Sequence, residues 1–504
     1  MELGLEGGGA EGAHGPRPSV ARSIGLTTVA TGLVYATTLL QQALYGRVLG
    51  VNADTDVLAT GLAWGVATTG LVGTTLTSAL LPTFVRAIQA DDAQRRSALR
   101  NGWALALAVA ALLTVATFVG AGVLANVLGP GLPPADREHL ANLLRLTSPL
   151  QLIWIASWMA VSIANAAERY ILAAASAILP PLPVLAMFAL SRPRVDDVAL
   201  GYVVGAVLQL VVLGIAGRRA FVGVAGKPDP RALRPLVRRL AMVGVAFAMM
   251  GAIPIVVRAI ASQGRAGDVA VADYASRLAL AGEQLVLSGL LAVIFTRWST
   301  KNPDLPVATT IARTLGVVVA VGVALPILAQ DLIAILLGGG RFTAENVNTV
   351  ATFLTWMAPG VASHMLLMVV ARALLAQARL AAFGAASAVA LIVFGVVAVA
   401  GHSVWGLQGV AVAYSLGWLS GVSVAIVGLH VASVPLLAEL ARSATTAGAA
   451  GLATWVVLQN LHDGPILRVA AGGFVFTICT LAIGRALGVS AVRYITNRLA
   501  RTTA

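Results

Sequence analysis

The chain consists of long apolar segments that alternate with short polar ones. Each apolar segment is close to the roughly 20 residues that an α-helix needs to cross the hydrocarbon core of a bilayer. This pattern predicts an all-α polytopic membrane protein with about fourteen transmembrane helices. The predicted spans lie approximately at residues 24–45, 57–84, 101–127, 140–165, 170–191, 198–217, 237–262, 270–296, 309–337, 347–375, 380–401, 406–431, 439–459 and 466–488.

Composition narrows the class of protein further. Hydrophobic residues make up 58% of the 504 residues and charged residues 11%, with a mean hydropathy of +0.87. Soluble domains carry roughly 25% charged residues, so a soluble enzyme is excluded. The sequence lacks a phosphate-binding glycine loop, paired metal-binding histidines and a Ser–His–acid arrangement, and its single cysteine, Cys479, cannot form an internal disulfide. We therefore expect no cofactor. The energy for transport would come from an ion gradient, the membrane potential or the substrate's own gradient.

The distribution of positive charge indicates the orientation. The net charge of +13 resides largely in short segments between apolar runs, which is a topology signal rather than a sign of a nucleic-acid partner. An even number of spans places both termini on one side of the membrane. The largest cationic group, which includes Arg218, Arg219, Lys227 and Arg231, lies between the sixth and seventh spans. Because cytoplasmic loops are enriched in Lys and Arg, both termini are predicted to be cytoplasmic.

An internal repeat divides the first twelve spans into two sixes. Residues 143–177 resemble residues 353–387, with Pro149 matching Pro359 and Arg169 matching Arg379 at a spacing of 210 residues. Six spans per unit preserve orientation, so the two lobes should be parallel, with a substrate site between them near the midplane. The predicted division is a disordered cytoplasmic tail at 1–22, a six-helix lobe at 23–217, a basic cytoplasmic linker at 218–236, a second six-helix lobe at 237–431, a helix pair at 432–488 and a cytoplasmic tail at 489–504.

The eighth span carries the strongest functional signal. Asp273, Arg277, Gln284 and Ser288 follow one another at spacings that place them on one helical face. An arginine inside a bilayer helix is costly, so it normally faces a wet cavity or a partner. One interpretation is a polar stripe that lines a transport pathway, with help from Arg258 of the preceding span. The other is that Arg277 pairs with Asp273 one turn away and only fixes the helix.

Weaker signals lie in the first two spans and in the tenth. Thr38 and Gln42 share one face of the first span with two tyrosines. Hydroxyl groups there and in the threonine-rich second span suit a sugar or phosphate cavity, but threonine also hydrogen-bonds the backbone of its own helix. Arg47 and Asp56 bracket the turn between these spans, where exposed charges are commonly only solvated. For His364, within the tenth span, a packed and hydrogen-bonded side chain is favoured over a proton relay.

Four segments match motifs of a known family. They are residues 47–56 (RVLGVNADTD), 81–84 (LPTF), 274–278 (YASRL) and 340–345 (GRFTAE). In these segments the sequence resembles the MviN/MurJ-type lipid II flippases of the multidrug/oligosaccharidyl-lipid/polysaccharide exporter superfamily. The similarity covers nearly the whole chain apart from the N-terminal tail.

The resemblance implies a fold and an activity. It implies two six-helix lobes around a cationic cavity, and a final helix pair that helps to form a groove for a lipid tail. The implied protein is a multi-pass flippase of the bacterial inner membrane. It would move a polyprenyl-diphosphate-linked cell-wall precursor, such as lipid II, from the inner to the outer leaflet by alternating access. Membrane lipids and cell-wall synthesis proteins would be further partners. The substrate-binding residues expected on this basis are Arg277, Arg258, Gln284, Thr38, Gln42, Arg47 and Asp56.

The chain differs from the family pattern at several cationic positions. The first span has Tyr35 where the family usually carries an arginine, and Gln41 and Gln42 where it carries an Arg-Asp pair. The second has residues 67–70 (ATTG) in the region of an Arg-Arg pair. Two other functions therefore stay open. A drug or small-cation exporter of the same superfamily would need acidic and aromatic residues in the cavity. A non-transporting scaffold would recruit cell-wall enzymes through its cytoplasmic loops.

Overall fold

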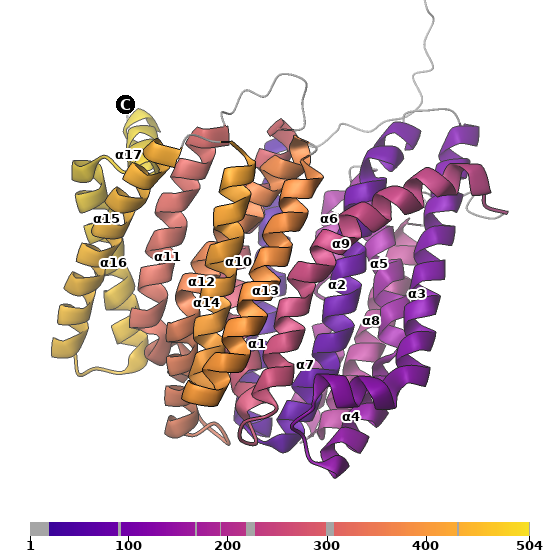
Figure 1. Ribbon diagram of the computed structural model, residues 1–504, viewed down its shortest axis with the longest axis horizontal. Coiled ribbons are helices and arrows are strands. Elements are labelled where there is room, and N and C mark those ends of the chain that lie inside the picture. Colours follow the sequence, from indigo (N-terminus) through magenta and orange to yellow (C-terminus); the bar gives the residue numbers. More distant parts are fainter. Residues whose placement is uncertain are drawn as a thin grey trace, which may run out of the picture.

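The computed structural model describes residues 20–88, 92–166, 169–191, 193–217, 227–298, 307–377, 379–430 and 433–502. These residues form helices joined by short turns (Figure 1). Within the described ranges, the β-type pairing is limited to one isolated bridge between Gly339 and Phe342. The all-α prediction is therefore confirmed. Most of the predicted N-terminal tail, and residues 218–226 of the predicted basic linker, lie outside the described residues.

The N-terminal half forms one group of helices, in which proline divides two of the predicted spans. Pro149 begins a new helix inside the predicted span 140–165, and Pro181 begins one inside the span 170–191. Proline lacks an N–H group and its ring clashes with the preceding turn, so a helix cannot run through it undisturbed. The elements are α1 (Val20–Leu44), the π-helix η1 (Tyr45–Leu49), α2 (Ala53–Ile88), α3 (Asp92–Leu128), α4 (Pro134–Thr147), α5 (Pro149–Ala166), α6 (Tyr170–Ser176), α7 (Pro181–Leu190) and α8 (Val195–Gly217).

The C-terminal half forms a second group, followed by a helix pair that packs against α11 (Figure 1). Here Pro326 and Pro359 lie inside α11 and α12 without ending them. Helix α12 is central in this group and is buried along most of its length. The elements are α9 (Pro230–Ala261), α10 (Asp268–Trp298), α11 (Val307–Leu336), α12 (Ala344–Ala376), α13 (Leu380–Trp405), α14 (Leu407–Gly428), α15 (Ser433–Asn460), α16 (Pro465–Leu487) and α17 (Ser490–Thr502).

The two arginines of the internal repeat occupy equivalent places. Arg169 precedes α6 and Arg379 precedes α13, with similar backbone angles (φ −91°, ψ 52° and φ −85°, ψ 57°). Arg169 Nη1 donates to the Ala216 carbonyl near the end of α8 (2.9 Å), and Arg379 Nη1 donates to the Gly428 carbonyl at the end of α14 (2.8 Å). In each half an arginine thus satisfies a carbonyl at a helix C-terminus. This correspondence supports the repeat, while the boundaries of the lobes stay a prediction.

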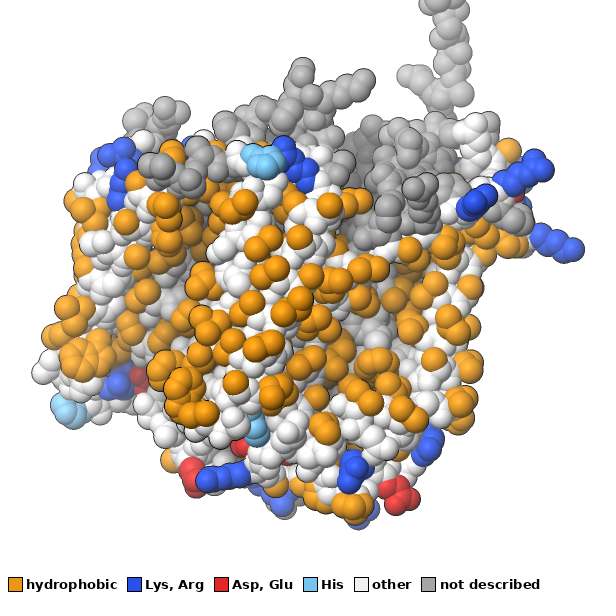
Figure 2. Space-filling model, in the orientation of Figure 1, with side chains coloured by type: hydrophobic (Ala, Val, Ile, Leu, Met, Phe, Trp, Pro, Cys, Tyr) orange, Lys and Arg blue, Asp and Glu red, His pale blue; other side chains and the backbone are white. Residues whose placement is uncertain are grey.

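The surface of the bundle is that of a membrane protein. Ten helices within the described ranges are long and apolar enough to cross a membrane. Hydrophobic side chains cover the middle of the face shown in Figure 2, and Lys and Arg gather toward its two ends. On α3, Val119 and Val123 are 77% and 69% exposed, which suits contact with lipid rather than water. The chain is therefore a multi-pass membrane protein, and the number of fourteen spans stays a prediction.

The hairpin of α13 and α14 depends on a close contact between two glycines. A Cβ added at Gly409 would lie 2.1 Å from the carbonyl oxygen of Gly401, so the two backbones leave no room for a side chain. Membrane helices associate through such close packing, and overpacking costs about 1–3 kcal/mol. We expect Gly409→Ala to lower the melting temperature of the purified protein by several degrees. Gly395→Ala on α13, where an added Cβ meets no atom within 4 Å, is the control. Equal melting temperatures for the two variants would contradict this role.

Candidate functional site

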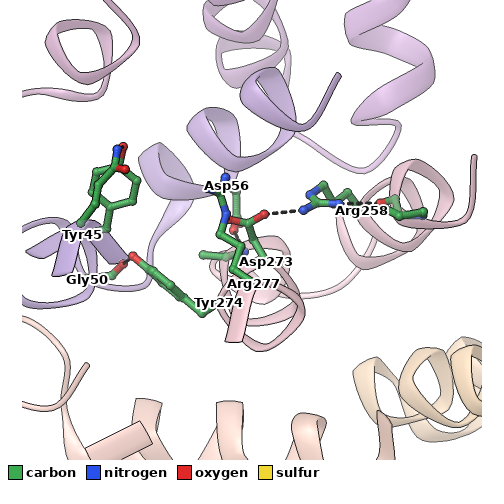
Figure 3. A network of polar contacts seen from close by, with 10 residues as sticks. Tyr45, Gly50, Asp56, Arg258, Asp273, Tyr274 and Arg277 are labelled. Atoms are coloured by element: carbon green, nitrogen blue, oxygen red, sulfur yellow. Dashed lines mark hydrogen bonds and ion pairs between the residues drawn. The ribbon is translucent and has the colours of Figure 1, made fainter. Parts of the chain in front are cut away.

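Three charged side chains from α9 and α10 form one cluster, the arginine–aspartate triad (Arg258, Asp273 and Arg277; Figure 3). Asp273 and Arg277 lie one turn apart on α10, and Arg277 Nε donates to Asp273 Oδ2 at 2.6 Å. Arg258, near the end of α9, donates to Oδ1 of the same carboxylate and also to the Pro254 carbonyl (2.7 Å). The short connection between α9 and α10 brings the two helix ends together, so one carboxylate holds both guanidinium groups.

The triad is buried and carries an excess positive charge. The side chains of Arg258, Asp273 and Arg277 are 9%, 7% and 21% exposed. Among the ion pairs of the described residues, Asp273 is the acid for both arginines, so the cluster has a net charge of +1. The Nε atom of Arg258 is buried without a hydrogen-bond partner. Buried charge is stable when it is paired, so this cluster is suited to accept an anion.

The space beside the triad is small in this conformation. A cavity of about 10 Å³ lies between the two halves, which is room for about one water molecule. Tyr45, Leu58 and Ala59 line it from the N-terminal half, and Tyr274 and Arg277 line it from the C-terminal half. Arg277 therefore faces the boundary between the halves. This space is too small for a group of several heavy atoms in the present conformation.

Asp56 is the main polar link across this boundary. It lies in the first turn of α2, is 2% exposed, and accepts the backbone N–H groups of Gly267 (2.6 Å) and Ala270 (2.7 Å) with its two oxygens. These donors belong to the N-terminal end of α10, whose free N–H groups and helix dipole favour an anion. The carboxylate of Asp56 thereby caps a helix of the opposite half of the molecule.

Contacts around η1 extend this link. The Tyr274 hydroxyl of α10 donates to the Gly50 carbonyl (3.1 Å), and the Arg341 N–H donates to the Arg47 carbonyl (2.8 Å). Gly50 has a φ of 78°, and a Cβ there would lie 3.0 Å from the side chain of Arg341, so the position requires glycine. We call this set of contacts the interlobe seam; it comprises Asp56–Gly267, Asp56–Ala270, Tyr274–Gly50 and Arg341–Arg47.

The structure separates the charged residues predicted for the site into two groups. Arg277 and Arg258 meet at Asp273 in the triad. Both interpretations of Arg277 keep support, because it pairs with Asp273 and also lines the cavity between the halves. Arg47 and Asp56 belong instead to the interlobe seam, where the exposed guanidinium of Arg47 donates to the Ile335 carbonyl (3.1 Å). The substrate-binding role of all four stays a prediction.

The uncharged residues predicted for the site lie on α1 and α10. Thr38 donates its hydroxyl to the Val34 carbonyl of its own helix (2.9 Å), as Thr68 of α2 does to Trp64 (2.7 Å). Gln42 is 2% exposed, and neither polar atom of its amide has a hydrogen-bond partner. A buried amide without partners is costly, which suits Gln42 to a ligand or a water molecule. The side chain of Gln284 lies outside the described residues.

Sequence reasoning missed two pairings in this region. It did not predict the ion pair between Arg258 and Asp273, because helical periodicity relates residues within one helix and not residues on two helices separated by a turn. It also did not join Glu283 of α10 to His364 of α12, which lie 2.8 Å apart. The packed and hydrogen-bonded side chain expected for His364 is observed, and a part in proton transfer stays a prediction. A usable signal was present, because ionisable residues on two apolar spans are seldom left without a partner.

The membrane-crossing helices form two groups. The interlobe seam links the groups, and buried charge lies at their boundary. This arrangement is that of a two-lobed transporter rather than an enzyme. The sequence profile of the family described as "Lipid II flippase MurJ" matches residues 49–462. The chain therefore belongs to the MurJ lipid II flippase family, as its motifs predicted.

Solved structures support this fold. A structure of the lipid II flippase MurJ in an inward closed conformation has a TM-score of 0.77 at 16% identity, and the match covers 92% of this chain and 99% of that one. An inward-facing multidrug resistance transporter of the MATE family has a TM-score of 0.62 at 14% identity, covering 82% and 98%. A MOP superfamily transporter from Pyrococcus furiosus has a TM-score of 0.61 at 13% identity, covering 83% and 96%. No curated protein is significantly similar in sequence.

Proposed function

We propose that this protein is a flippase that moves a polyprenyl-diphosphate-linked cell-wall precursor of the lipid II type across the bacterial inner membrane. The observation that carries the proposal is the buried net positive charge of the triad at the boundary between the two halves. A diphosphate is an anion with several acceptor oxygens, and arginine binds such groups through charge-assisted, often bidentate hydrogen bonds. Membership of the MurJ family supports the same class of substrate.

The triad and the interlobe seam together support transport by alternating access. While the seam is intact, the triad is closed off at that end of the bundle. Opening at the opposite, cytoplasmic end would admit the diphosphate to Arg277, and breaking the seam would then release it toward the outer leaflet as one lobe rocks against the other. The membrane potential, negative inside, would favour outward movement of the anionic headgroup by about 2.3 kcal/mol per charge and 100 mV.

The charge of the triad argues against export of a drug cation. MATE transporters share the fold, but here two arginines surround one acid. An organic cation beside Arg277 would meet a like charge, which costs several kcal/mol at a buried contact, about enough to prevent binding. A non-transporting scaffold is the remaining alternative, and a transport measurement distinguishes it.

A flipping assay with reconstituted protein tests the proposed function. Liposomes that contain the purified full-length chain should move a fluorescent undecaprenyl-diphosphate-linked disaccharide between leaflets, measured by its accessibility to a membrane-impermeant quencher. A fluorescent phosphatidylglycerol, which has one phosphodiester and no glycan, should move no faster than in protein-free liposomes. Equal movement of both lipids would indicate unspecific scrambling, and movement of neither would support the scaffold role.

The proposed orientation places both termini in the cytoplasm and the seam at the outer side. A topology reporter inserted after Arg219, between α8 and α9, should report a cytoplasmic location. One inserted after Gly338, in the turn between α11 and α12, should report an exterior location. The reason is the excess of Lys and Arg in the segments on the cytoplasmic side. Activity of both reporters on the same side would contradict the orientation and the number of spans between them.

A further inference from the structure

Glu283 and His364 form an ionisable pair inside the bundle that the triad and the seam do not include. Glu283 lies on α10 and His364 on α12, with Oε2 and Nδ1 2.8 Å apart. Their side chains are 5% and 17% exposed. Because an α-helix rises about 1.5 Å per residue, Glu283 lies about 9 Å along α10 from Arg277. The pair is therefore separate from the cluster that we assign to the diphosphate.

Aromatic side chains surround the pair. Tyr35 of α1 and Tyr414 of α14 both lie close enough to Glu283 to interact with its charge. Trp418 of α14 lies against the imidazole of His364, with ring centroids 4.3 Å apart. Among the described residues, the titratable groups of neighbouring helices that interact with Glu283 are thus two phenols. Neither of them is a cation that could permanently balance the carboxylate of Glu283.

The charged residues of the packed helices are engaged elsewhere or are distant. Helices α13 and α14 contain no Asp, Glu, Lys or Arg. On α11, Arg313 lies over the ring of Tyr494 and Asp331 pairs with Arg468. On α12, Arg372 lies eight residues beyond His364, which is about 12 Å along the axis. The acid and cation that α2 and α9 bring to α10, Asp56 and Arg258, belong to the seam and the triad.

We propose that Glu283 and His364 form a proton-binding site that couples transport to a proton gradient, an inference that rests on the proposed transport function. With a neutral imidazole the pair has a net charge of −1, and one added proton makes it neutral overall. A buried net charge is costly in an apolar environment, so the pair has reason to hold that proton. Histidine exchanges protons near physiological pH, so the site can be filled on one side of the membrane and emptied on the other.

The position of Tyr35 connects the proton to the conformational change. Tyr35 belongs to the N-terminal half, whereas Glu283, His364 and Trp418 belong to the C-terminal half. In the present state, with the seam closed, Tyr35 interacts with the charge of Glu283, so the surroundings of the pair include side chains of both halves. Opening of the seam moves the two halves apart and changes these surroundings, so the pair gains access to the exterior and takes up a proton there. In the state that is open to the cytoplasm the pair releases the proton, opposite to the movement of the substrate.

A fluorescence titration tests proton binding without any substrate. Full-length protein in lipid nanodiscs should change its tryptophan fluorescence between pH 5 and 8, over about two pH units, because an imidazolium cation forms beside Trp418. His364→Gln keeps a donor for Glu283 but cannot titrate, and it should abolish the change, as should Trp418→Phe. His462→Gln, at an exposed position between α15 and α16, is the matched control and should retain it. Persistence of the change in His364→Gln, or its absence from the unmodified protein, would overturn the site.

A transport measurement with an imposed pH gradient tests the coupling. With the membrane potential held at zero, an acidic exterior should raise the rate for the unmodified protein severalfold, and the same gradient should leave His364→Gln unaffected. If the transport rate of the unmodified protein does not depend on the imposed gradient, the coupling is overturned. If no lipid moves with any variant, the proposed flippase function fails, and the fluorescence titration still decides the existence of the proton site.

Discussion

Replacing Arg277 with alanine should abolish detectable transport while the protein reaches the membrane at its normal level. Asp273 keeps the hydrogen bond from Arg258 in this variant, so no buried acid loses all its partners. The charge of the triad falls from +1 to zero, and the anion loses the more exposed of the two guanidinium groups. Loss of such a buried charged contact costs about 2–5 kcal/mol. In the flipping assay this corresponds to a rate lower by roughly 30-fold or more.

Three further variants decide whether Arg277 binds substrate or only holds the helix. Arg277→Lys keeps the positive charge but loses the planar guanidinium, which can donate two parallel hydrogen bonds, so partial transport should remain. Arg442→Ala removes a half-exposed arginine that pairs with Glu439 on α15, and it should transport normally. The double change of Asp273→Ala with Arg277→Ala should be abundant and inactive if Arg277 contacts the diphosphate. Full activity of the double variant would mean that Arg277 has a structural role only.

Replacing Asp56 with alanine should open the interlobe seam. The change removes the acceptor of two backbone N–H groups, Gly267 and Ala270, and leaves both donors buried at the start of α10. A buried donor left without a partner costs about 1–3 kcal/mol, so the closed state loses much of its advantage over the open one. A cysteine placed at Ala59, which lines the cavity beside the triad, should then react with a water-soluble thiol reagent. We expect its labelling rate to rise by about tenfold or more, with Cys479 replaced beforehand.

The neighbouring acid on α2 provides the control for this experiment. Asp54→Ala removes a carboxylate from the same helical turn, but the side chain of Asp54 is exposed. The labelling rate at Ala59→Cys should therefore stay at its original value in that background. Equal protection of the cysteine in the Asp54 and Asp56 variants would show that the carboxylate of Asp56 does not hold the two halves together.

The extent of the helices follows closely from residue type along the chain. The span predicted at 270–296 lies within α10 (Asp268–Trp298), and the one predicted at 380–401 lies within α13 (Leu380–Trp405). A bilayer demands about 20 apolar residues per crossing and internally satisfied backbone groups, so local composition determines where such helices run. The division of the span 140–165 into α4 and α5 at Pro149 was less visible, because α11 and α12 each continue through a proline and proline alone does not mark the end of a helix.

The candidate site was only partly accessible from the sequence. Spacing along one helix related Asp273 to Arg277 correctly, since residues four apart share a face. It could not show that Arg258 shares the same carboxylate, or that Asp56 accepts hydrogen bonds from the start of α10. Glu283 was visible as a charged residue in an apolar helix, but its partner lies 81 positions further along the chain.

The sequence by itself determined that this protein is an all-α membrane transporter of the MurJ family, and that Arg277 occupies a polar face of one helix. These properties depend on composition, periodicity and short motifs, which are local. Only the tertiary structure decided which polar groups meet: Asp273 with two arginines, Asp56 with Gly267 and Ala270, and Glu283 with His364. Contacts between helices depend on the rotation and axial shift of each helix against its neighbours. Packing of the whole bundle sets those two quantities, and the pattern within a single helix does not contain them.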